Sequence, residues 1–232
     1  MFPEFSEQQP QTSRRPSFAE EYRRVQEDVV ADKQERPVMA LVVIDAQNDF
    51  SEGGALAVDG AIAAYRRTHL HVAGTVGRYS VLAVTRDNHI DPGSHWSDEP
   101  DFVDSWPRHC AAGEPGVELH PAMVTALELF EQVNPHAVRV DVTKGEYEAA
   151  YSGFEGRTEA GVPLADALRA SDVAHLDVAG VATDHCVRAT VLDALKEGFT
   201  IRVLADQCAA VDPVRGEEAL AEMEAAGAEI RR

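Results

Sequence analysis

Cysteine is scarce in this 232-residue chain. There are three, Cys110, Cys186 and Cys208, and no two form a Cys-x-x-Cys pair. An odd, widely spaced set does not build a disulfide framework, and the missing pairs exclude a zinc ribbon made of thiolates. The cysteine content therefore indicates a reducing compartment, and we expect the cytoplasm.

Basic residues are also few. Lys and Arg number 21 against 40 Asp and Glu, which gives a formal net charge of −19. This charge repels phosphate backbones and anionic membrane surfaces, so we expect neither nucleic acid nor a membrane as a partner. No apolar run approaches the roughly 18 residues of a membrane-spanning helix, and the first residues lack the basic start and apolar core of a signal peptide.

The chain divides into two parts of different composition. Residues 1–36 form an N-terminal extension, a polar tail followed by a predicted amphipathic helix from Phe18 to Gln34. We expect this helix to pack on the body or on a second subunit, the latter giving a homo-oligomer. Residues 37–232 are long enough, at 44% hydrophobic content over the whole chain, to bury one full core.

The second part alternates apolar runs with helix-length segments. The pattern predicts strands at residues 38–44, 81–85, 138–142, 176–181 and 201–205, and helices at 61–79, 121–132, 163–170, 187–197 and 215–226. Strands that are apolar throughout and alternate with helices indicate a parallel sheet covered on both faces. We therefore predict an α/β, doubly wound, mainly parallel β-sheet with helices on both faces.

Four chemically useful side chains follow the predicted strands. Asp45, Asp87 and Lys144 end the first three runs, and Cys186 lies just after the fourth. In open α/β sheets ligands bind at the carboxyl ends of the strands, so the topology should bring these groups together. The long loops 88–120 and 145–162 are expected at the same edge, where loops of this length are often functional.

Cys186 stands at the predicted strand-to-helix elbow. There the free N–H groups and the helix dipole should lower the thiol pKa and offer donors to an oxyanion. Asp45 could take the thiol proton, and Lys144 would stabilise the ionised pair, which together suits amide hydrolysis through a thioester. The alternatives are a buried inert cysteine, a strand-end cap at Asp45 and a solvated Lys144.

A second cluster, Asp87, His89, His95 and His109, lies within one loop-sized stretch. A carboxylate with imidazoles suits a divalent Zn, Fe or Mn ion with positions left for water or substrate. Ordinary hydrogen-bonded loop histidines are the alternative.

Aromatic residues in the same loops could enclose a flat ring. We expect Phe50, Trp106, Tyr147 and Tyr151 to form such walls, and we assign Trp96, Phe102 and Phe154 to the core.

Several of these segments, in this order, resemble one known family. They are VVIDAQNDF (42–50), DNHIDPGSH (87–95), WPRHC (106–110), Lys144-Gly145 with YSGFEG (151–156), and GVATDHCV (180–187). Together they are similar to the actinobacterial type of the nicotinamidase/pyrazinamidase family, within the isochorismatase-like cysteine hydrolases. The resemblance covers residues 38–225.

The resemblance implies an isochorismatase-like hydrolase fold and a role for each matched residue. Cys186 would be the nucleophile, Asp45 the general base and acid, and Lys144 the third member of the triad. Asp87, His89 and His109 would hold one divalent metal ion, with His95 as a fourth ligand, and the metal would take the pyridine nitrogen of nicotinamide.

The resemblance also assigns the surroundings of the substrate. The N–H groups of Ala182 and Cys186 would form the oxyanion hole, and the Val181–Ala182 bond would be cis. Phe50, Trp106, Tyr151 and His185 would line the ring pocket. Asn88 departs from the family, which commonly has an aromatic residue there, so packing around the metal should differ.

The implied function is hydrolysis of nicotinamide to nicotinate and ammonia in NAD salvage, with pyrazinamide as a further substrate. The alternatives are a related cysteine amidohydrolase acting on a carbamoyl or ureido substrate, a catalytically silent binding subunit, and a metallohydrolase that uses metal-bound water. The small molecule nicotinamide is the expected partner in the leading hypothesis.

Overall fold

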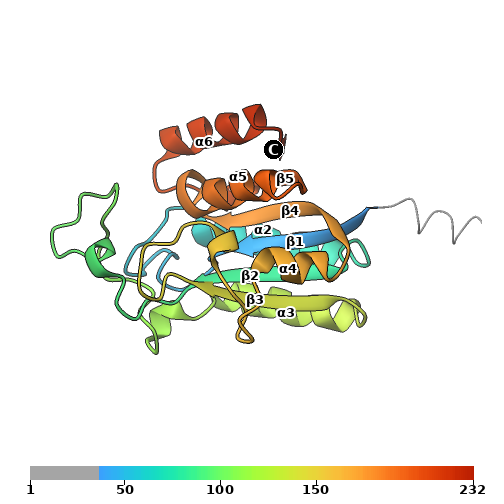
Figure 1. Ribbon diagram of the computed structural model, residues 1–232, viewed down its shortest axis with the longest axis horizontal. Helices are drawn as coiled ribbons and strands as arrows, with labels where there is room; N and C mark the ends of the chain where they lie inside the picture. Colours follow the sequence, from blue (N-terminus) through green and yellow to red (C-terminus); the bar gives the residue numbers. More distant parts are fainter. Residues whose placement is uncertain (1–36) are drawn as a thin grey trace, which may run out of the picture. The chain divides into compact units, whose positions relative to one another are not determined.

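Six parallel strands form a single sheet in the computed structural model, in the order β3-β2-β1-β4-β5-β6 (Figure 1). They are β1 (Val38–Ile44), β2 (Val81–Asp87), β3 (Val138–Lys144), β4 (Val173–Val181), β5 (Thr200–Ala209) and β6 (Glu229–Arg231). The chain moves outward from β1 to β3, then crosses back to β4 beside β1 and moves outward the other way. The β1/β4 boundary is therefore the switch point at which α/β sheets bind ligands.

Helices cover both faces of the sheet. Helices α2 (Ala61–Gly74) and α3 (Pro121–Val133) pack on one face, against side chains such as Leu41 and Val43 of β1. Helices α4 (Leu164–Arg169), α5 (Arg188–Lys196) and α6 (Pro213–Ala225) pack on the other, against Val42 and Ile44. Because strand side chains alternate between faces, β1 can be apolar in every position and still be buried. The predicted doubly wound architecture is confirmed.

Four short helical turns lie in the connections. They are η1 (Gly93–His95), η2 (Pro115–Val117), η3 (Gly153–Glu155) and the π-helical turn η4 (Thr183–Val187). A capping box stabilises η3, in which the Ser152 hydroxyl accepts from a backbone N–H and the Glu155 carboxylate accepts from the Ser152 N–H. These turns shape the loops at the carboxyl edge of the sheet.

Two differences from the predicted elements have local causes. The first predicted helix ends at Gly74 rather than at residue 79, because a turn follows in which Gly77 has a φ of 74°. Strand β6 was not predicted, since its three residues are too few to show a pattern.

The structure describes residues 37–232, and the compact unit within it spans Val38–Arg232. The predicted helix from Phe18 to Gln34 lies outside the described residues, and the division of the chain at residue 36 stays a prediction. Among residues 37–232, no helix has both the length and the apolar character needed to cross a bilayer.

Candidate active site

The site begins at the junction of β1 and β4. Asp45 follows β1 with a φ of 47°, and its side chain is completely buried. On β4, Gly180 has a φ of 122°, and a Cβ added there would lie 2.1 Å from the carbonyl oxygen of Ile44. A residue without a side chain is therefore required for the two strands to approach this closely beside Asp45.

Cys186 lies in the π-helical turn after β4. The Val187 N–H donates to the Ala182 carbonyl, five residues earlier, at 3.1 Å, and this spacing defines a π-type turn. The Asp184 carboxylate ties the turn to the segment after β5 by accepting from the N–H groups of Val211 at 2.9 Å and Asp212 at 3.1 Å. The Val181–Ala182 bond is cis, as the resemblance implies.

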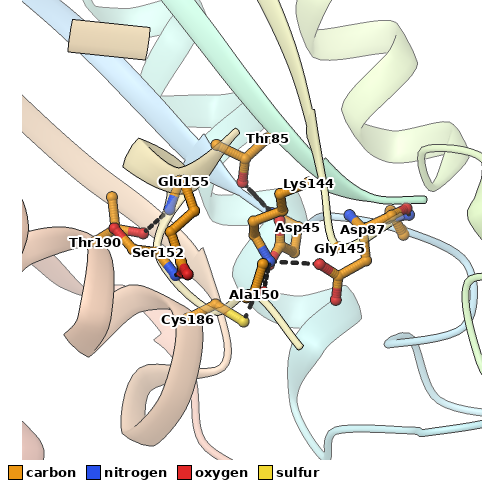
Figure 2. A network of polar contacts seen from close by, with 12 residues as sticks. Asp45, Thr85, Asp87, Lys144, Gly145, Ala150, Ser152, Glu155, Cys186 and Thr190 are labelled. Atoms are coloured by element: carbon orange, nitrogen blue, oxygen red, sulfur yellow. Dashed lines mark hydrogen bonds and ion pairs between the residues drawn. The ribbon is translucent and has the colours of Figure 1, made fainter. Parts of the chain in front are cut away.

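One ammonium joins the predicted triad (Figure 2). Lys144 Nζ lies 3.0 Å from Asp45 Oδ2 and 3.7 Å from Cys186 Sγ, and it also forms an ion pair with Asp87 Oδ1. Its remaining contact is a 2.9 Å hydrogen bond to the Ala150 carbonyl. The triad side chains, placed far apart in the sequence, thus meet at one buried point.

Burial and charge set the protonation states. Burial raises the pKa of the Cys186 thiol well above its ordinary value, and the nearby Lys144 only partly offsets this. The expected lowered thiol pKa is therefore wrong, because desolvation of the thiolate and the nearby carboxylates of Asp45 and Asp87 raise the pKa. Burial also raises the pKa of Asp45, which makes its carboxylate a stronger base.

Lys144 keeps its positive charge in this arrangement. Burial opposes the Lys144 ammonium, but Asp45 and Asp87 together raise its pKa well above the ordinary value. Burial likewise pushes the pKa of Asp87 upward, yet Lys144 and His89 hold it below the ordinary value. Lys144 is therefore charged and Asp87 ionised, which leaves Asp45 as the group that exchanges protons with the thiol.

Three histidines meet beside this cluster, since one ring nitrogen from each of His89, His95 and His109 lies within 4.8 Å of the others. His89 Nδ1 donates to the Gly145 carbonyl at 2.5 Å and His109 Nδ1 to the Pro107 carbonyl at 2.7 Å. A neutral imidazole that donates from Nδ1 carries its lone pair on Nε2. Both rings are therefore oriented with an Nε2 lone pair for a ligand.

The donor set fits a divalent metal ion. His89 Nε2 and His95 Nδ1 are buried and have no hydrogen-bond partner within residues 37–232, and Asp87 Oδ2 lies 3.8 Å from His89 Nε2. Burial, with His109 and His89 nearby, lowers the pKa of His95 to about 4, so its ring is neutral, as a metal ligand must be. Three imidazoles and a carboxylate suit Zn, Fe or Mn.

One cavity is lined both by Cys186 and by two of the three histidines. Its lining includes Asp87, His95, His109, Ala182 and Cys186, together with the predicted ring-pocket residues Phe50, Trp106, Tyr151 and His185. Trp106 Nε1 donates to the Tyr151 hydroxyl at 3.1 Å, and the Trp106 and His185 ring centroids are 5.0 Å apart. These walls are suited to a flat aromatic ring.

Three aromatic assignments are wrong. Tyr147 is 67% exposed and does not line this cavity, Phe102 is half exposed rather than part of the core, and the half-buried Trp96 packs against the His89 ring rather than in the core. All three lie in loops, where an aromatic residue is not forced inward by strand or helix periodicity. Tyr147 instead borders a separate open groove of about 740 Å³, which does not contain Cys186.

Two buried residues of the site were missed. The Gln47 amide donates to the carbonyls of Asp87 and Val117 and accepts from the Asp87 N–H, each at 2.8 Å. The Thr85 hydroxyl donates to Asp45 Oδ1 at 2.6 Å. One feature of the sequence could have indicated both residues: each is a polar residue, on or just after a mostly apolar strand, two positions from a predicted site residue.

The sequence also matches a known protein family. The model of the isochorismatase domain matches residues 39–232. The chain belongs to the isochorismatase family. The resemblance inferred from the sequence motifs, and the fold that it implied, are confirmed.

Relatives of this isochorismatase-family protein carry more specific names. It is 44% identical to a nicotinamidase/pyrazinamidase of Mycobacterium tuberculosis, and the match covers 82% of this chain and 97% of that protein. It is 33% identical to a nicotinamidase of Escherichia coli, and that match covers 84% of this chain and 94% of the relative. The crystal structure of the Pyrococcus horikoshii pyrazinamidase in complex with zinc has a TM-score of 0.68 and 34% identity, covering 84% of this chain and 99% of that one.

Proposed function

We propose that this protein is a metal-dependent cysteine amidohydrolase that converts nicotinamide to nicotinate and ammonia, and that it also deamidates pyrazinamide. The observation that carries the proposal is one cavity lined by Cys186, the thiol of the thiol–carboxylate–ammonium cluster, and by His95 and His109 of the three-histidine cluster. The named relatives support the choice of substrate, since nicotinamidases and pyrazinamidases remove ammonia from an aromatic carboxamide.

In the first half-reaction, Cys186 Sγ attacks the carboxamide carbon and its proton passes to Asp45. The N–H groups of Ala182 and Cys186 are the donors that we assign to the oxyanion. The tetrahedral adduct then collapses, the C–N bond breaks, and Asp45 returns its proton to the departing nitrogen, so that ammonia leaves and a thioester remains. Lys144 keeps its charge throughout and stabilises the negative charge shared by Sγ and Asp45.

In the second half-reaction, water adds to the thioester carbon while Asp45 takes one of its protons. The C–S bond breaks, and the proton on Asp45 restores the thiol. Nicotinate leaves, and the cycle closes with one water consumed for each ammonia and carboxylic acid formed.

Asp87, His89, His95 and His109 are the residues that would hold the metal. When bound, a divalent ion supplies a Lewis acid for the pyridine nitrogen, which would orient the ring with its carboxamide toward Cys186. Zn, Fe and Mn remain the candidates, and zinc is the ion in the Pyrococcus horikoshii complex. A cytoplasmic location and a homo-oligomer stay predictions from the sequence.

The test is ammonia release from nicotinamide by the wild type, Cys186→Ala and Cys208→Ala, with the metal content of each preparation measured. Cys208 is a suitable control because it is half-buried and lies outside the cavity lining. We expect Cys186→Ala to lose at least about 10³-fold in kcat while keeping its metal, and Cys208→Ala to stay near wild type.

Other outcomes would contradict the proposal in different ways. Turnover retained by Cys186→Ala would favour metal-bound water as the nucleophile. A wild type that is inactive on nicotinamide but releases ammonia from a carbamoyl or ureido compound would favour the related amidohydrolase.

A further inference from the structure

The hydroxyl of Thr85 is a site feature that the proposed reaction does not yet use. Thr85 lies on β2, in the strand next to β1, and is completely buried beside Asp45. Its hydroxyl donates to Asp45 Oδ1 at 2.6 Å and accepts from the Asp45 N–H at 3.2 Å (Figure 2). One hydroxyl thus contacts both the backbone and the side chain of the same residue.

The two oxygens of Asp45 consequently have different surroundings. Oδ1 is occupied by the Thr85 hydroxyl. Oδ2 lies 3.0 Å from Lys144 Nζ and has no hydrogen-bond partner within residues 37–232. A carboxylate oxygen of Asp45 and Cys186 Sγ lie within 4.8 Å of each other. The oxygen left available for the thiol proton is therefore Oδ2.

We infer that Thr85 is a positioning residue that reserves Asp45 Oδ2 for proton transfer with Cys186. A carboxylic acid carries its proton on one oxygen, and the other becomes its carbonyl oxygen. Because Thr85 donates to Oδ1, Oδ1 is the carbonyl oxygen, and the proton taken from the thiol stays on Oδ2, where the departing nitrogen can receive it. Thr85 itself gains and loses no proton in the cycle.

The hydrogen-bonding role of Thr85 can be tested apart from its packing, because valine has nearly the same shape as threonine and lacks the hydroxyl. The Thr85 methyl Cγ2 lies against Gly153, where an added Cβ would come within 2.8 Å of it. Thr85→Val keeps this methyl and replaces the hydroxyl with a second methyl group of similar size, whereas Thr85→Ser keeps the hydroxyl and removes the methyl. Comparing the two variants therefore separates the effect of losing the hydrogen bond from the effect of losing the packing.

The inference rests on the proposed function and is tested by steady-state kinetics on nicotinamide. For Thr85→Val we expect kcat to fall about 10- to 100-fold, the range for losing a hydrogen bond to a charged group, with KM and metal content unchanged within about twofold. Thr85→Ser should recover kcat to within about threefold of wild type. Thr68→Val is the matched control, because it removes a buried hydroxyl from α2, whose acceptor is the Ala64 carbonyl, outside the site.

Equal kcat values for Thr85→Val and Thr85→Ser would overturn the inference, as would a Thr85→Val whose loss lies in KM or metal content. If Thr85→Val does not fold, Thr85→Ala removes the same hydroxyl and takes its place in the comparison.

A second experiment tests Thr85 even if the wild type releases no ammonia from nicotinamide and the proposed function fails. It measures the rate at which iodoacetamide alkylates Cys186, followed by peptide mass. Alkylation slowed severalfold in Thr85→Val but not in Thr85→Ser would still support the inference, and equal rates would overturn it.

Discussion

Two buried carboxylate networks lie in the same sheet and differ in how completely they are paired. Asp177, in the middle of β4, accepts at Oδ2 from Tyr79 at 2.5 Å and from Arg202, and at Oδ1 it has His175 at 3.2 Å. Both of its oxygens are therefore occupied. Asp45 is equally buried, but its Oδ2 has no hydrogen-bond partner in the described part of the chain.

The two networks also differ in charge. Around Asp177, one carboxylate faces the guanidinium groups of Arg202 and, at 3.5 Å, Arg78. In the active site, two carboxylates share the single ammonium of Lys144. Burying a charge is costly unless it is fully paired, so the first arrangement is built for stability. The second leaves lone pairs and charge available, which is what catalysis requires.

The largest effect should come from removing the shared cation. Lys144→Met leaves two buried carboxylates facing each other, so we expect kcat/KM to fall at least about 10³-fold and the free energy of unfolding to drop by about 3 to 5 kcal/mol. Nicotinamide kinetics and urea unfolding measure the two quantities. Lys196→Met is the control, because within residues 37–232 this exposed lysine pairs with Asp193 alone, and its loss should cost less than about 1 kcal/mol. Similar destabilisation in both variants would show that Lys144 is not held as a buried ion.

The next largest effect should be the loss of stability in Asp177→Asn, which is to be compared with the effect of the same change at Asp45. Burial pushes the Asp177 pKa upward, but hydrogen bonds from Arg202 and Tyr79 hold it below the ordinary value. The stability it contributes is present above its unfolded pKa of about 3.9 and is lost as the pH falls through the lower folded pKa. Asp177→Asn should therefore lower the free energy of unfolding at pH 7 by about 2 to 4 kcal/mol, with kcat/KM nearly unchanged. The difference from wild type should shrink below pH 4.

Asp45→Asn should behave in the opposite way. A raised folded pKa means that the ionised form is disfavoured in the folded protein, so the wild type loses stability as the pH rises from the unfolded to the folded pKa. At pH 7 the variant should be as stable as wild type or more stable, while turnover is lost. Urea unfolding at pH 4 and pH 7 with parallel kinetics measures both variants. Destabilisation by Asp45→Asn that equals that of Asp177→Asn would remove the distinction between the networks.

The smallest effect concerns the support of the metal ligands. Gln47→Leu removes the amide that holds both backbone groups of Asp87, and we expect metal affinity to fall about 10- to 100-fold, as for other residues that orient metal ligands. Competition with a chelator measures the affinity without any assay of turnover. Gln207→Leu replaces another buried amide, on β5, and should leave the affinity unchanged. Equal losses in both variants would assign the effect to general destabilisation.

The sequence predicted the part of the site that topology determines. Asp87 and Lys144 are the last residues of β2 and β3, Asp45 and Cys186 come after β1 and β4, and parallel strands bring their carboxyl ends to one edge. It could not predict the raised pKa of Cys186, because the desolvation of a thiol depends on how deeply the loops cover it. Gln47 and Thr85 were missed for a similar reason, since a neutral polar residue in a strand gives no sign of its partner until the strands are placed side by side.

Lys144 and Gly145 are consecutive, and this adjacency links the two halves of the site. The Lys144 side chain contacts the thiol cluster, while the Gly145 carbonyl orients His89, and an added Cβ at Gly145 would lie 2.7 Å from the His89 ring. The position of the Lys144 ammonium and that of the Gly145 carbonyl both depend on the register of β3 against β2, in which Lys144 pairs with Asp87. A one-residue slip of β3 would turn the ammonium to the opposite face of the sheet and withdraw the carbonyl from the imidazole at once. An insertion or deletion in this edge strand should therefore disable acyl transfer and metal binding together, even where the rest of the fold survives.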